Sequence, residues 1–83
     1  MNIEEQLKNE TKKWKKRIES ELKRVKAADK NGEHALENVK AYVRDSQYFL
    51  EKNDLTRAFE AIIWAWAVLT VKTEDKIIVS ENS

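Results

Sequence analysis

The near absence of helix-breaking residues limits this chain more than any other feature. Its 83 residues include no proline and a single glycine. These are the two residues least compatible with a helix interior, so the chain is expected to be helical. It also has no cysteine, which excludes disulfides and thiolate metal sites and gives no sign of an oxidising compartment. A chain of this length suits one domain with a small core.

The spacing of the apolar residues predicts three helices. Less polar residues recur every three or four positions over about residues 2–30, and again over about 33–52 and 55–73. That period places them along one side of each helix. The connections are very short, so neighbouring helices are expected to be antiparallel. The predicted fold is all-α: an antiparallel up-down-up three-helix bundle over residues 1–73, followed by a short extended C-terminal tail over residues 74–83 that contains the β-branched Ile77, Ile78 and Val79.

Capping residues are predicted at the helix ends. Asn2 begins a pattern that resembles a capping box. Asn31 and Gly32 can adopt the positive φ angle that closes the first helix. Asn53 suits a left-handed position at the end of the second helix, and Asp54 is a plausible N-cap for the third.

The central part of the third helix is apolar on every side. From Ala61 to Val71, Thr70 is the only polar residue, although the whole chain is 37% charged. Its main face, with Phe59 and Trp66, is expected to point into the bundle, which leaves a second apolar stripe on the opposite side. This stripe is either a subunit interface or is covered by the first helix or the tail. We expect the interface, formed by Trp64, Val68, Val71, Ala61 and Ala67, with Tyr48 of the second helix as an accessory residue.

The stretch from Tyr42 to Leu69, YVRDSQYFLEKNDLTRAFEAIIWAWAVL, resembles the helical hairpin of an archaeal family, the domain of unknown function 357. The resemblance covers about residues 10–70. It implies a three-helix bundle and an archaeal source, and it supplies no activity. Two positions depart from the family pattern: Asn53 replaces the usual turn glycine, and Thr70 replaces a common Asp. The matching positions are Tyr48, Phe49, Leu50, Glu51, Lys52, Asp54, Arg57, Ala58, Phe59, Ala61 and Ala65.

No catalytic or ligand-binding motif is found in the sequence. His34 is the single histidine, and a lone histidine beside a turn is usually solvated. A thiol nucleophile is impossible without cysteine, and one glycine cannot form a glycine-rich phosphate loop. The eleven-residue apolar run is also shorter than the roughly 20 residues that cross a membrane. We therefore expect a cytoplasmic, non-enzymatic protein with no cofactor, no metal site, no small-molecule ligand and no membrane span.

Positive charge is concentrated in the first helix. Residues 1–30 hold ten Lys or Arg and six Asp or Glu, although the whole chain has a net charge of +1. A lysine flank of this kind can follow the phosphates of nucleic acid or of a membrane surface, or it can simply be solvated. Trp14 lies in register with the core stripe, so it is expected to be buried rather than to stack on bases. The predicted flank consists of Lys8, Lys12, Lys15, Lys16, Lys23 and Lys26.

Two functions therefore compete. The first is a small interaction module that self-associates, most simply as a homodimer, or docks on a protein partner through the outer face of the third helix. The alternative is a nucleic-acid-associated accessory protein that uses the lysine flank. A subunit of an enzyme is the weakest hypothesis, because no catalytic group is found.

Overall fold

The computed structural model describes residues 2–81 of the chain. Its elements are α1 (Ile3–Leu22), β1 (Val25–Ala27), α2 (Lys30–Glu51), α3 (Leu55–Glu74) and β2 (Ile78–Ser80). The molecule is elongated, measuring 42 × 19 × 17 Å. The predicted all-α bundle of three helices is confirmed, and a two-stranded sheet is added to it. Residue 1 of the predicted bundle and residues 82–83 of the predicted tail lie outside the described residues.

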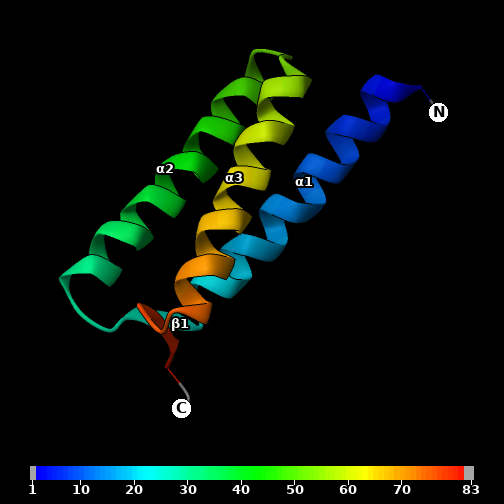
Figure 1. The fold of residues 1–83 in the computed structure, drawn as a ribbon. Helices are drawn as coiled ribbons and strands as arrows, with labels where there is room; N and C mark the ends of the chain where they lie inside the picture. Colours follow the sequence, from blue (N-terminus) through cyan, green and yellow to red (C-terminus); the bar gives the residue numbers. More distant parts are fainter. Residues whose placement is uncertain (1, 82–83) are drawn as a thin grey trace.

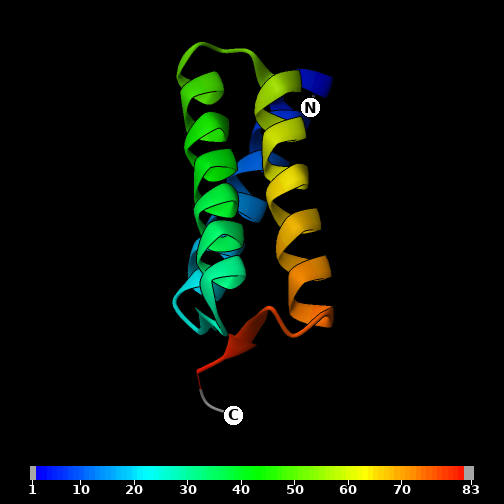
Figure 2. The same ribbon diagram turned by 60° about the vertical axis from the view of Figure 1, so that its left-hand side comes forward.

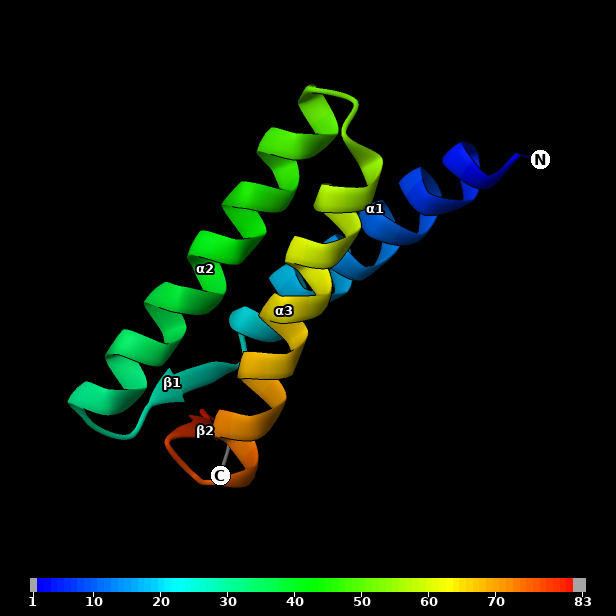
Figure 3. The same cartoon turned by 45° about the horizontal axis from the view of Figure 1, so that its top comes forward.

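The three helices do not pack equally. α2 and α3 form a close antiparallel hairpin, and α1 contacts mainly α3 (Figure 1). α1 crosses the hairpin obliquely, so that its N-terminal end stands away from both other helices (Figure 3). This oblique crossing leaves open hollows beside α1 and distinguishes the molecule from a regular bundle of three aligned helices.

The turn between α2 and α3 is stabilised by its own residues. Asn53 has a φ angle of 59°, in the left-handed region. Its N–H donates to the carbonyl of Leu50 at 3.1 Å, and the N–H of Asp54 donates to the carbonyl of Phe49 at 2.8 Å. This is the Schellman pattern of helix ends. The carboxylate of Asp54 then accepts from the N–H of Arg57 at 3.3 Å and caps α3. The predicted roles of Asn53 and Asp54 are confirmed.

The first helix is shorter than predicted. Its start is confirmed, because Asn2 accepts from the N–H of Glu5 at 2.8 Å. It ends at Leu22 rather than near Lys30, and residues 25–27 form β1 instead. β1 pairs antiparallel with β2, with Val25 opposite Ser80 and Ala27 opposite Ile78. The physical reason is burial: the pairing encloses the side chains of Val25 and Ile78 in the core, whereas a continued helix leaves the β-branched residues of the tail without a partner.

Gly32 does not close the first helix, contrary to the prediction. It lies in the first turn of α2, is buried, and has no positive φ angle. Asp29 is the N-cap of α2 and accepts from the N–H of Gly32 at 3.1 Å. A Cβ atom at this position would lie 2.3 Å from the carbonyl oxygen of Ile77 and 2.9 Å from Ala27. Glycine is therefore required here because the backbone of the C-terminal segment passes directly over α2.

The core is built from all three helices and both strands. Its fully enclosed side chains include Ile18 of α1, Val39 of α2, Ile62 of α3 and Ile78 of β2. One buried hydroxyl joins the hairpin helices: Ser46 donates to the carbonyl of Ala58 at 2.8 Å. Within residues 2–81, no buried side-chain nitrogen or oxygen lacks a hydrogen-bond partner, as expected of a well-packed interior.

Two tryptophans, Trp14 and Trp66, connect α1 and α3 through direct contacts. The rings of Trp14 and Trp66 meet edge to face, with centroids 5.9 Å apart. The indole N–H of Trp66 donates to the backbone carbonyl of Trp14 at 3.1 Å, and that of Trp14 donates to Glu10 at 3.0 Å. Trp14 and Trp66 are both only half-buried, as is Phe59, because the oblique α1 covers this edge of α3 incompletely.

Candidate interaction surfaces

An apolar patch occupies the outer side of α3. Trp64 is 59% exposed, Val71 is 51% exposed and Ile63 is 44% exposed. Ala67 is also exposed, and Val68 is half-buried because it packs against the core. A shallow hollow of about 230 Å³ lies among Trp64, Ala67, Val68 and Val71, beside Lys72. We call the set Ile63, Trp64, Ala67, Val68 and Val71 the α3 patch.

The patch is exposed because the other helices cover different sides of α3. Trp66 bonds to α1 on one side, and Ala58 accepts a hydrogen bond from α2 on another. Figure 2 shows α1 behind the α2–α3 hairpin, so that none of the described elements lies in front of α3. With two sides occupied and the apolar run extending around the helix, the third side carries apolar residues without a partner among residues 2–81.

Two of the predicted interface residues are placed elsewhere. Ala61 is only 7% exposed, so it belongs to the interior and not to the outer stripe. It follows Ala58 by one turn, where small residues let α2 approach α3 closely enough for the Ser46 bond. Tyr48 is exposed on α2, where its ring meets Phe49 edge to face at 5.4 Å, and it does not line the patch.

Ile63 is the patch residue that the sequence prediction missed. It lies next to Trp64 and is turned away from the buried Ile62 and Ala65. A helix turns about 100° per residue, so a position one step beyond a core residue falls near the border between the faces. The signal was therefore present in the sequence, but the apolar run around it made the border hard to locate.

Four of the six predicted lysines line one groove. Lys8, Lys12, Lys15 and Lys16 of α1 face α2 across a hollow of about 530 Å³, whose other lining residues are Glu19, Gln47, Leu50 and Glu51. Lys15 pairs with Glu19 at 3.3 Å. No ion pair is found for Lys8, Lys12 or Lys16 within the part of the chain that the structure describes. We call this hollow the lysine groove.

Lys23 and Lys26 are not in the lysine groove. The prediction placed them on one flank of a continuous helix, but α1 ends at Leu22. Lys23 is the C-terminal cap of α1, and Lys26 lies in β1, where the chain has already changed direction. The basic surface is therefore confined to the helical part of the predicted flank.

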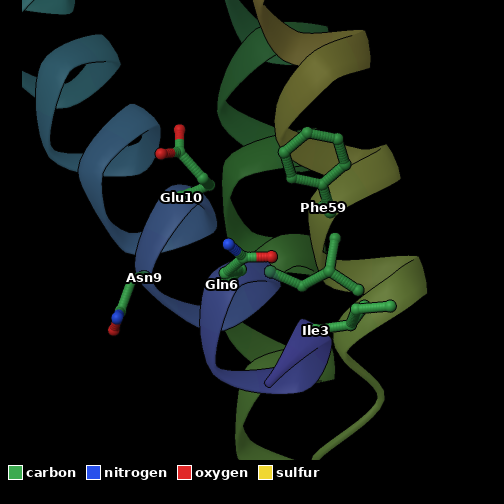
Figure 4. Close-up of a pocket in the computed structure, with 6 residues that line it drawn as sticks. Ile3, Gln6, Asn9, Glu10 and Phe59 are labelled. Carbon is green, nitrogen blue, oxygen red and sulfur yellow. The ribbon is translucent and has the colours of Figure 1, made fainter. Parts of the chain in front are cut away.

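A third hollow lies near the N-terminus. It has a volume of about 450 Å³ between the first turns of α1 and Phe59 of α3. Ile3 and Phe59 face this space in Figure 4, whereas Asn9 points away from Phe59. Ile3 is 74% exposed. The hollow exists because α1 diverges from the hairpin at this end.

Among residues 2–81, no group of three or more His, Cys, Asp or Glu is placed so that it could hold a metal ion. His34 is exposed on α2. No described helix combines the length and the apolar character that a membrane crossing needs.

Comparison with protein families gives a match over residues 13–72 to the family described as protein of unknown function (DUF357). The chain belongs to this family. The matched residues include the whole α3 patch, all of α2 and α3 as far as Lys72, and they leave out Lys8 and Lys12 of the lysine groove. The resemblance predicted from the hairpin is confirmed, with nearly the predicted extent.

A solved structure of a family member supports the fold. The chain is similar to the crystal structure of protein AF1782 from Archaeoglobus fulgidus, an archaeon, with 43% sequence identity and a TM-score of 0.87. The similarity covers 95% of this chain and 99% of that protein. A comparison with curated proteins found no match. The solved relative therefore supports the fold, and the function has to be argued from the surfaces.

Proposed function

We propose that this chain is a non-enzymatic interaction module that binds a second copy of itself through the α3 patch. The exposure of Trp64 within an apolar surround supports this proposal. The largest exposed apolar patch of a soluble protein is often a functional contact site, and tryptophan is enriched among the residues that contribute most to binding.

The spacing of the patch favours a second copy as the partner. Trp64, Ala67, Val68 and Val71 are distributed symmetrically about the point midway between positions 67 and 68. If two α3 helices cross antiparallel at that point, Trp64 of each copy meets Val71 of the other, and Ala67 meets Val68. A two-fold interface requires this kind of self-complementarity. The small side chain of Ala67 lets the two helices approach closely.

Charges beside the patch fit the same arrangement. Lys72 borders the apolar hollow, and Glu60 lies one turn before Trp64 on the exposed side. In the antiparallel pair, Glu60 of one copy is displaced along the helix axis by about 4.5 Å from Lys72 of the other, which long side chains can span. Exposed ion pairs contribute little affinity, but they favour the antiparallel orientation over the parallel one.

The size of the patch limits the strength of the dimer. Stable interfaces bury about 800 Å² on each partner. The α3 patch is smaller than that, because it has five side chains and only Trp64 and Val71 are more than half exposed. We therefore expect a reversible dimer with a Kd in the micromolar range, about 1–100 µM, because association must also offset the lost freedom of two molecules.

The test is sedimentation velocity over a range of protein concentrations. The unaltered chain is expected to shift from monomer to dimer as its concentration rises, and the double variant Trp64→Glu, Val71→Glu is expected to remain a folded monomer. Val68 is left unchanged because it packs against the core, so that its replacement would confuse unfolding with dissociation.

Tyr48→Glu is the matched control, because Tyr48 is also an exposed aromatic residue but lies outside the patch. It is expected to dimerise as the unaltered chain does. An unaltered chain that stays monomeric at the highest concentration would contradict the proposal, and so would equal dissociation by the control.

A further inference from the structure

We infer that the lysine groove binds the phosphate backbone of a nucleic-acid duplex without reading its sequence. This inference is independent of the proposed dimer, since the groove and the α3 patch share no residue. It rests on three observations: the alignment of the lysines along α1, the excess of positive charge in the groove, and the concave shape of the site.

The lysines extend over a length of α1 that can run beside several phosphates. Lys8, Lys12 and Lys16 follow one another at intervals of one helical turn along one side of α1, and Lys15 lies beside them. From Lys8 to Lys16 the helix rises by about 12 Å. One strand of a duplex carries a phosphate about every 3.4 Å along its axis, so a length of about 12 Å holds about four phosphates that the lysines can contact.

The groove keeps a positive charge despite two glutamates. Glu19 is paired with Lys15 at 3.3 Å, and Glu51 accepts a hydrogen bond from Gln47 at 3.2 Å. Four lysines against these two carboxylates leave an excess of two positive charges in a hollow of about 530 Å³. A concave site that carries an excess of one charge concentrates the field on a ligand of the opposite charge.

The lining favours a duplex over other phosphate-bearing surfaces. A single strand is usually held by aromatic side chains on which its bases stack, and none of the described residues that line the groove is aromatic. A membrane surface is usually met by exposed apolar side chains next to the lysines, whereas Leu50, the apolar lining residue, is half-buried. The backbone of a duplex is a convex ridge of negative charge, and such a ridge fits a groove.

The experiment measures binding of the full chain to a short fluorescent DNA duplex by anisotropy, from about 50 to 200 mM salt. Two variants are compared, each losing two positive charges. Lys12→Gln, Lys16→Gln removes lysines from the groove, and Lys23→Gln, Lys26→Gln removes lysines that lie outside it. All four of these lysines are exposed, and circular dichroism checks that both variants are folded.

The groove variant is expected to bind at least about tenfold more weakly at the lowest salt and to lose about 1.8 from the slope of log K against log salt, since each phosphate contact contributes about 0.9. The control variant is expected to lose less than about threefold. Absence of binding at low salt overturns the inference, and so does equal weakening by the two variants, which would reflect net charge alone.

Vesicles of anionic lipid are the second probe. Groove-dependent binding to vesicles without binding to the duplex assigns the site to membranes and also overturns the inference.

Discussion

The two connections between consecutive helices differ in where their conformation is determined. The turn from α2 to α3 is held by Asn53 and Asp54, which supply the left-handed residue and the N-cap themselves. The connection from α1 to α2 is held by a distant segment: β1 pairs with β2, and the N–H of Ala28 donates to the carbonyl of Ile77 at 3.0 Å. Local sequence is therefore sufficient to predict the turn from α2 to α3, and it is insufficient to predict the connection from α1 to α2.

The difference also explains why the sequence predicts the wrong role for Gly32, as the residue that ends the first helix. Glycine after asparagine is a common helix-ending signal, and nothing near Gly32 in the sequence shows that the backbone of Ile77 passes 2.3 Å from the position of a Cβ atom there. The same residue type can permit a positive φ angle or a close backbone approach. Only the tertiary structure distinguishes these two uses.

The largest expected effect comes from removing the distant support of the connection from α1 to α2. Ile78 is fully buried in the core cluster, so Ile78→Ala is expected to lower the free energy of unfolding by about 3–4 kcal/mol. The measurement is urea unfolding followed by circular dichroism. Val79→Ala is the matched control, because Val79 is a half-buried neighbour in the same strand, and it is expected to cost about 1 kcal/mol.

Hydrogen exchange on Ile78→Ala sharpens the comparison. The amides of β1 and Ala28 are expected to lose protection, because their partners are in the C-terminal segment. Those of Asn53 and Asp54 are expected to keep it, because their acceptors are in α2. Equal loss of protection in both connections would show that the two are not independent.

A smaller effect is expected from filling the space at Gly32. Gly32→Ala introduces a methyl group that must displace Ile77 or Ala27, and overpacking of this kind costs about 1–3 kcal/mol. In an exposed helical position the same change would instead stabilise by up to about 1 kcal/mol. Asn31→Ala, at the exposed preceding position, is the control and is expected to be close to neutral in thermal unfolding. A Gly32→Ala protein as stable as this control would refute the close approach.

The sequence was sufficient for features that depend on helical periodicity. The three helices, the exposed Trp64 and Val71, and four lysines on one side of α1 all follow from residues within one helix. Other features depend on contacts between distant segments. The end of α1, and with it the exclusion of Lys23 and Lys26 from the groove, is determined by pairing with β2.

The same distinction holds within the α3 patch. Periodicity identified the outer side of α3, but it could not show how closely α2 approaches that helix. The close approach buries Ala61, which the prediction placed in the interface. Conversely, Ile63 is exposed because α1 does not cover the side of α3 on which it lies. The borders of a helical face are therefore determined by the neighbouring helices, even where its centre is visible in the sequence.

The smallest expected effects compare two helix ends that share one geometry. α3 ends as α2 does: Lys76 has a φ angle of 61°, its N–H donates to the carbonyl of Thr73 at 3.1 Å, and the N–H of Ile77 donates to that of Lys72 at 2.9 Å. Neither end uses glycine, the usual residue at this position. The left-handed conformation costs an ordinary L-residue about 1–2 kcal/mol, and asparagine tolerates it better than lysine does.

Replacing Asn53 or Lys76 by glycine therefore tests how much free energy the left-handed conformation costs at each helix end. Glycine relieves the left-handed cost but adds entropy to the unfolded chain, which offsets about 0.5–1 kcal/mol of the gain. Lys76→Gly is expected to stabilise the protein by about 1 kcal/mol, and Asn53→Gly by about 0.5 kcal/mol or less, measured as shifts in the urea midpoint at unchanged slope. If Asn53→Gly stabilises more than Lys76→Gly, the lysine side chain must itself support the turn into β2. The C-terminal segment would then be held by local contacts as well as by its pairing with β1, and the contrast between the two connections would be weaker than the hydrogen bonds indicate.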